Sequence, residues 1–167
     1  PVGAVLIQNG KFIAKAHNQP VSKNDPTAHA EIQVLRAAGE KLGNYRLTNS
    51  ALYVTLEPCA MCFGAMVHAR IERIVYGAYD SKTGVCGSCT DLRSSNCFKH
   101  QINITGGILK NECSQILHTF FELRSSRKRS IPAGSSPNII FKRLESSAGR
   151  ENPLLVALAY RADEIDA

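Results

Sequence analysis

The chain has 167 residues, of which 44% are hydrophobic and 20% charged, and its formal net charge is +6. This length and composition fit one globular domain with a real core and exclude a disordered or fibrous protein. The apolar runs are too short to span a bilayer, and the closely spaced cysteines suit a metal better than a disulfide framework. We expect no secretory leader before the domain. We therefore expect a cytoplasmic protein with no membrane contact.

The first half of the chain predicts strands alternating with helices. "VGAVLI" and "KFIAKAH" flank Asn9-Gly10, a strong signal for a β-hairpin, and Gly39 marks the expected end of the first helix. Periodicity and turn residues predict these elements in chain order: strands at 2–7 and 11–17, a helix at 28–38, a strand at 51–56, a helix at 59–70 and a strand at 73–78. The pattern ββαβαβ indicates an α/β domain.

The second half is less regular. "QINITGG" predicts a short strand, and a helix follows it. The apolar residues of this helix share one face, which favours a role in the core or at an interface. They are Ile108, Leu109, Cys113, Ile116, Leu117, Phe120 and Phe121. The cluster "RSSRKR", residues 124–129, could lie along a phosphate backbone or be a solvated helix end. "SIPAGSSPN" reads as a linker, and residues 139–167 could hold one more amphipathic helix without any motif.

Two motifs together carry the chemistry of a metal site. "DPTAHAEI" contains His29, and "EPCAMC" contains Cys59 and Cys62. Zinc prefers imidazole and thiolate ligands, and a catalytic zinc keeps three protein ligands so that water can take the fourth position. The two cysteines lie at i and i+3 in the first turn of a helix, where both sulfurs face one side and the helix dipole stabilises thiolates. The sequence therefore predicts one catalytic zinc per chain.

Glu31 distinguishes a catalytic metal from a structural one. It lies two residues from His29, where a carboxylate could move protons for a zinc-activated water. The joint pattern H-x-E followed by P-C-x-x-C is the signature of zinc-dependent nucleobase deaminases. A histidine at the first ligand position argues against the free cytidine deaminases, which carry Cys there.

Over nearly all of residues 1–124, the chain resembles the bacterial tRNA-specific adenosine deaminases of the TadA type. The matching segments, in order, are "PVGAVLI", "HNQP", "DPTAHAEI", "NYRL", "LYVTLEPCAMCFGAM", "HARI" and "GAYDSKTG". The resemblance implies a cytidine-deaminase-like fold, a three-layer α/β/α arrangement with a central mixed five-stranded sheet. It implies hydrolytic deamination of adenosine to inosine at the wobble position of a tRNA, with an arginine tRNA expected. Zinc would be held by His29, Cys59 and Cys62, and Glu31 would shuttle protons as zinc-bound hydroxide attacks C6.

The same resemblance implies further substrate contacts. Asn18 matches a substrate-contacting Asn at the mouth of the pocket, and Asp80 matches an Asp near the nucleotide beside the target base. A turn Asn and a helix-capping Asp are the plain alternatives. Phe120 and Phe121 could border the base or pack in the core. The expected partners are a tRNA anticodon arm and a second copy of the chain in a homodimer, with no organic cofactor.

Two departures from the family bear on domain organisation. Family members carry a further N-terminal helix before the position of Pro1, so we expect that element to be missing from a deaminase domain at 1–124. Residues 125–167 are expected to form a basic segment, a linker and a C-terminal extension of unknown role.

Three alternatives stay open. Cys86, Cys89, Cys97 and His100 have spacing that a second, structural zinc could use, although ordinary loop thiols are the preferred interpretation. A deaminase of free bases or nucleosides would leave "GAYDSKTG" and the basic cluster without a purpose. A noncatalytic zinc protein that binds RNA would leave Glu31 without one.

Overall fold

The computed structural model describes residues 2–130, and the side chains of residues 2–123. Its elements in chain order are β1 (Gly3–Gln8), β2 (Lys11–His17), α1 (Pro20–Lys23), α2 (Ala30–Leu42), β3 (Ser50–Leu56), α3 (Ala60–His68), β4 (Arg73–Ala78), β5 (Asn103–Gly106) and α4 (Lys110–Ser130). None of the helices in this described part is both long and apolar enough to cross a membrane.

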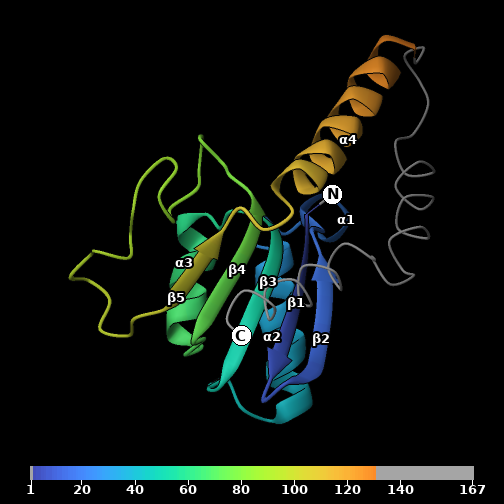
Figure 1. Ribbon diagram of the computed structural model, residues 1–167. Helices are drawn as coiled ribbons and strands as arrows, with labels where there is room; N and C mark the ends of the chain where they lie inside the picture. Colours follow the sequence, from blue (N-terminus) through green and yellow to red (C-terminus); the bar gives the residue numbers. More distant parts are fainter. Residues whose placement is uncertain (1, 131–167) are drawn as a thin grey trace.

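One mixed sheet organises the molecule (Figure 1). Its five strands follow the order β2-β1-β3-β4-β5, with β1 antiparallel to β2 and β3, and β3-β4-β5 parallel. The hairpin between β1 and β2 forms because Asn9 and Gly10 take positive φ angles of 50° and 72°, which a two-residue hairpin turn requires. The expectation of a mixed five-stranded sheet is confirmed.

Helices cover both faces of the sheet. The larger core lies between the sheet and the α2–α3 layer, and it includes the fully buried Val34, Leu52 and Met66. On the opposite face, Cys113 of α4 packs in a smaller cluster that includes Tyr53 and Val75. These two cores make the three-layer α/β/α arrangement that was expected. Beyond its first turns α4 rises away from the sheet, as Figure 1 shows.

Most of the expected bounds lie within two residues of the observed ones, and the larger differences concern α2 and α1. The first long helix, α2, runs through Gly39 to Leu42, and Gly43 follows as its C-cap with a φ of 62°, the left-handed conformation. Gly39 and Gly43 both suit the end of a helix, and only their backbone angles show which of them is the C-cap. The short helix α1, which begins at Pro20, was not expected; a single turn is too short to give a periodic signal.

The basic segment over 124–129 lies within α4, at its C-terminal end. The linker and amphipathic helix expected after it fall at 131–167, outside the described residues.

Candidate active site

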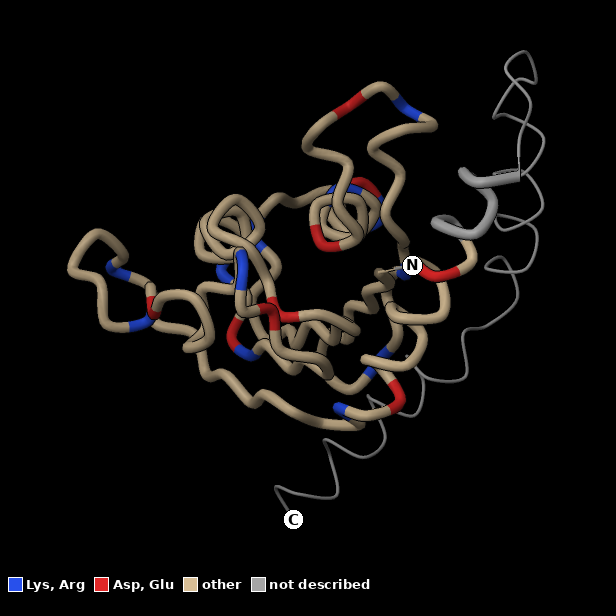
Figure 2. Tube along the Cα trace, turned by 90° about the horizontal axis from the view of Figure 1, so that it is seen from above, with Lys and Arg blue, Asp and Glu red and all other residues tan. Residues whose placement is uncertain are grey.

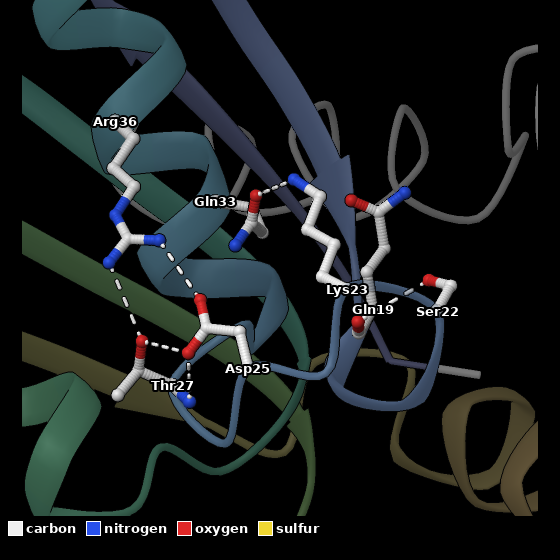
Figure 3. Close-up of polar contacts among 7 residues, drawn as sticks. All are labelled: Gln19, Ser22, Lys23, Asp25, Thr27, Gln33 and Arg36. Atoms are coloured by element: carbon white, nitrogen blue, oxygen red, sulfur yellow. Dashed lines mark hydrogen bonds and ion pairs between the residues drawn. The ribbon is translucent and has the colours of Figure 1, made fainter.

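His29 is the N-cap of α2. The loop before it is tightly hydrogen-bonded around Asp25 and Thr27, as Figure 3 shows. Asp25 Oδ1 accepts hydrogen bonds from the backbone N–H of Thr27 at 2.8 Å and from its hydroxyl at 2.7 Å. Those two bonds are the main reason that the pKa of Asp25 is lowered. Arg36 reaches back from α2 to Asp25 at 3.3 Å and to the Thr27 hydroxyl at 3.4 Å. The loop is therefore fastened to the helix that it precedes.

Asn18 lies beside the same helix start. Its side-chain Oδ1 accepts a hydrogen bond from the backbone N–H of Ala30 at 2.7 Å, which satisfies one of the donors that an α-helix leaves open at its first turn. The Asn18 backbone N–H donates to the carbonyl of Val2 at 3.0 Å. Asn18 thus holds the turn that presents His29. The substrate contact expected of its amide stays a prediction.

Cys59 and Cys62 come from the junction between β3 and α3. Cys59 is the N-cap of α3 and is half-buried, while Cys62 is fully buried in the first turn. Pro58 is buried directly before them, at a helix entry where its missing N–H costs nothing. This is the geometry that the i, i+3 spacing predicted.

The tertiary fold brings the imidazole to the two thiols. His29 Nδ1 lies 3.7 Å from Cys59 Sγ and 3.6 Å from Cys62 Sγ. Within the described residues, these three side chains make the one group of at least three possible metal ligands, with donor atoms within 4.8 Å of one another. One nitrogen and two sulfurs at this separation fit a zinc ion, with a fourth position left for water.

The electrostatics of the thiol pair suit a cation. A hydrogen bond from Cys62 and backbone N–H groups at the start of α3 lower the pKa of Cys59 to about 5. The pKa of Cys62 is raised, first because it shares its proton with Cys59 and second because it is buried. The two pKa values are thus shifted in opposite directions, and a divalent cation would favour the thiolate form of both groups.

Glu31 lies in the first turn of α2 and is 4% exposed. Burial raises the pKa of its carboxyl to about 7, and the negative charge of Cys59 adds to this. The charge of His29 and a hydrogen bond with Cys62 act in the opposite direction. The carboxyl is thus next to the ligand group and shielded from bulk water, as the H-x-E motif predicted.

Asp80 begins the loop after β4. It is half-buried, and its carboxylate accepts hydrogen bonds from the backbone N–H groups of Lys82 at 2.9 Å and Thr83 at 3.2 Å and from the Thr83 hydroxyl at 2.6 Å. Burial opposes ionisation, but these bonds outweigh it and lower the pKa of Asp80. The Asp80 carboxylate therefore caps the turn that follows it, which is close to the capping role considered as the alternative to substrate binding. A contact with substrate stays a prediction.

Glu57 was not singled out from the sequence, yet it is one of two buried carboxylates in the described part of the chain. It follows the buried strand β3 and precedes Pro58 and the first cysteine ligand. Its carboxylate accepts hydrogen bonds from the backbone N–H groups of Asp80, Cys86 and Ser88. The signal in the sequence that could have identified Glu57 is a charged residue directly after an apolar strand.

The aromatic pair on α4 is not part of the group around His29. Phe120 is half-buried and Phe121 is 55% exposed, and their rings meet edge to face with centroids 5.5 Å apart. Neither ring belongs to the core clusters of the described residues. Their expected place beside a substrate base stays a prediction.

The residues considered for a second zinc occupy different surroundings. Cys86 is buried in the main core, whereas Cys89 and Cys97 are exposed. His100 Nε2 is hydrogen-bonded to the carbonyl of Ile71 at 2.7 Å. Within residues 2–130, no three of them form a possible ligand group.

Comparison with known proteins agrees with this site. Residues 1–124 match the family described as MafB19-like deaminase. The chain is 48% identical over 130 residues to a tRNA-specific adenosine deaminase of Haemophilus influenzae, covering 77% of this chain and 75% of the relative. It is 46% identical over 129 residues to the tRNA-specific adenosine deaminase of Bacillus subtilis, covering 77% and 80%.

A solved structure is similar as well. It comes from a study of A-to-I editing by tRNA:A34 deaminases at the wobble position of transfer RNA. Its TM-score is 0.66 at 44% identity, covering 70% of this chain and 84% of that one. The fold expected from the sequence is therefore shared with a solved deaminase.

Proposed function

The chain belongs to the MafB19-like deaminase family, and from this premise we propose that it hydrolyses adenosine to inosine at the wobble position of a tRNA anticodon. An arginine tRNA is the expected substrate. The observation that carries the proposal is a buried carboxyl, Glu31, beside a His/Cys/Cys ligand group in a chain 48% identical to a tRNA-specific adenosine deaminase.

His29, Cys59 and Cys62 would hold the zinc ion. When bound, zinc lowers the pKa of a coordinated water and so supplies a nucleophile at neutral pH. Hydrolysis adds water across the C6–N1 bond of adenine, and the C6–N6 bond then breaks to release ammonia. Glu31 takes a proton from the water and gives it to N1, then moves the hydroxyl proton at C6 to the departing N6. Its burial excludes bulk water from both transfers.

The rest of the RNA would be held outside the active site around His29 and Glu31. Acidic and basic residues are mixed along the described trace, with neither sign confined to one side (Figure 2). The densest positive cluster in the sequence is instead Arg124 to Arg129, on the last turns of α4. Phosphate contacts there would position the anticodon arm, while the pocket reads the flipped base. Asn18 and Asp80 would contact the target nucleotide and its neighbour, and Phe120 and Phe121 would border the base.

The active unit is expected to be a homodimer working in the cytoplasm, where tRNA is used. The outer surface of the α2–α3 layer supports self-association. It has a shallow cavity of about 590 Å³ lined by Ile32, Leu35, Tyr45 and Ala65, among others. Among these lining residues, Tyr45 is 68% exposed. An exposed aromatic side chain in such a groove favours burial against a second copy.

The test is to incubate the zinc-loaded protein with a panel of purified tRNAs and to sequence the products for inosine. We expect conversion at position 34 of one or a few tRNAs, and a rate on the anticodon stem-loop that falls steeply with salt, because phosphate contacts release counterions. Turnover of free adenosine at a comparable, salt-insensitive rate would favour a nucleoside deaminase. RNA binding without any inosine would favour the noncatalytic alternative.

A further inference from the structure

Glu57 is a buried carboxyl group to which the proposed chemistry assigns no role. It is 2% exposed, and among the described residues only Glu31 is a carboxylate of similar burial. Burying an ionised carboxylate is costly unless hydrogen bonds replace its lost water. A charge kept at this position must therefore be stabilised by nearby donors.

Those donors all come from one distant segment, the loop of residues 80–88. Glu57 Oε2 accepts hydrogen bonds from the backbone N–H of Asp80 at 3.1 Å and from the hydroxyl of Ser88. Glu57 Oε1 accepts from the backbone N–H groups of Cys86 at 2.9 Å and Ser88 at 3.2 Å. One carboxylate thus binds both ends of the loop, which exposes Lys82 and Thr83 at its outer turn.

Gly84 allows the loop to close over the carboxylate. A Cβ atom at Gly84 would lie 2.5 Å from the Asp80 carbonyl oxygen and 2.5 Å from Cδ of Glu57. Its backbone pairs with that of Cys59, and the N–H of Val85 donates to the Pro58 carbonyl at 3.0 Å. The loop therefore lies directly against the turn that carries the first cysteine ligand.

We propose that Glu57 is a positioning residue, which fastens loop 80–88 to the Cys59 turn and so fixes the Asp80 side of the pocket for RNA. The proposal rests on the proposed function, since it assigns the loop a part in substrate binding. Glu57 acts only through the loop. Its loss should weaken binding of RNA while the ligand group and Glu31 keep their geometry.

The primary variant is Glu57→Gln, which keeps the shape but turns one acceptor oxygen into a donor that faces other donors. Losing charge-assisted hydrogen bonds should raise KM for the anticodon stem-loop about tenfold or more, with kcat per bound zinc within about twofold of the parent. Hydrogen exchange of the Asp80, Cys86 and Ser88 amides should accelerate. Glu72→Gln is the matched control, because Glu72 is exposed, precedes β4, and its carboxylate accepts a hydrogen bond from the Asn49 backbone N–H.

A variant from the loop side tests the same claim independently. Gly84→Ala should give the same KM effect and the same loss of amide protection, because its Cβ would push the loop off Glu57. In a double variant with Glu57→Gln, Gly84→Ala should raise KM little further, since both changes break the same contact. Gly64→Ala, where nothing lies within 4 Å of the added Cβ, should leave KM and amide protection at the parent level.

Several results would overturn the proposal. Parent-like KM and amide exchange in zinc-loaded Glu57→Gln would do so, and so would a fall in kcat at constant KM. If Glu57→Gln does not fold, Ser88→Ala can be used instead, because it removes the hydrogen bond from the Ser88 hydroxyl to Glu57. Unchanged hydrogen exchange of the Asp80 amide in that variant would contradict the proposal. If the parent protein does not deaminate RNA, the proposed function fails, and hydrogen exchange still decides whether Glu57 fastens the loop.

Discussion

At the scale of single residues, two buried glutamates on neighbouring segments have opposite environments. Both oxygens of the Glu57 carboxyl accept hydrogen bonds from backbone N–H groups of one loop. Burial dominates at Glu31 and raises its pKa to about 7, although a divalent cation beside it would lower that value. Glu31 is therefore the carboxyl of the two that can exchange a proton during a reaction.

The first prediction concerns that proton. Glu31→Gln should reduce the rate of the chemical step at least about a hundredfold, because the amide cannot carry a proton between water and base. Zinc content and RNA affinity should stay close to the parent values, since size is preserved. Single-turnover kinetics, with zinc measured on the same sample, would check this.

Glu40→Gln is the control for that experiment, since Glu40 is exposed on the same helix. It should deaminate at the parent rate. A Glu31→Gln protein that reacts nearly as fast as the parent would mean that another group shuttles the proton.

A second prediction concerns the metal ligands. The parent should contain one zinc per chain, and Cys62→Ser should lose most of it, because a hydroxyl is a far weaker zinc ligand than a thiolate. Cys89→Ser should keep its zinc, since Cys89 is exposed and outside the ligand group. Metal analysis by mass spectrometry would distinguish these outcomes. Two zinc ions per chain would revive the Cys86 to His100 site, and none would remove the basis of the proposed function.

At the scale of elements, the contact between β4 and α4 depends on a missing side chain. Cys113 is fully buried and lies over Gly77, where an added Cβ would clash with its sulfur and would lie 2.8 Å from its Cβ. The same Cβ would lie 3.1 Å from the carbonyl oxygen of Thr55 on the neighbouring strand. The glycine in β4 thus sets how closely the start of α4 approaches the sheet.

The third prediction follows from this contact. Gly77→Ala should lower the free energy of unfolding by about 1–3 kcal/mol, the usual cost of overpacking a core. The cost should be smaller in a Cys113→Ala background, because the nearest clashing atom is gone. Urea denaturation of the four zinc-saturated proteins of this double-mutant cycle would measure it. Equal losses in both backgrounds would show that the strain comes from the strand rather than from α4.

At the scale of the whole molecule, the six cysteines fall into distinct environments. Cys89 and Cys97 are exposed, while Cys86 and Cys113 are buried. Burial raises the pKa of Cys86 to about 12 and that of Cys113 to about 11, so both are protonated thiols at neutral pH. The thiolate is the reactive form, and therefore burial and protonation act together against modification.

The fourth prediction uses this difference. With zinc bound, the folded chain should show two fast-reacting thiols with a chromogenic disulfide reagent, Cys89 and Cys97, and all six in denaturant. Removing zinc with a chelator should expose Cys59 as a third, because it is only half-buried. Circular dichroism would verify that the chelated chain stays folded. Fast labelling of Cys86 or Cys113, identified by peptide mass spectrometry, would contradict the described packing.

Local signals in the sequence were sufficient for several features. Asn9-Gly10 determined the hairpin because few other residues accept two successive positive φ angles. The spacing of Cys59 and Cys62 placed both thiols on one side of a helix entry, since residues three apart share a helix face. The same local information could not decide between Gly39 and Gly43 as the end of α2, because both satisfy the same sterics.

The tertiary structure determines which of these local segments come into contact. The sheet sets the starts of α2 and α3 side by side, and this brings His29 to the thiols, as the motif led us to expect. Nothing local to Glu57 indicates that loop 80–88 will supply its hydrogen bonds. The reason is physical: backbone sterics and helix periodicity act over a few residues and can be read along the chain. Burial of a charge and its compensation depend on which distant segments the sheet order brings together.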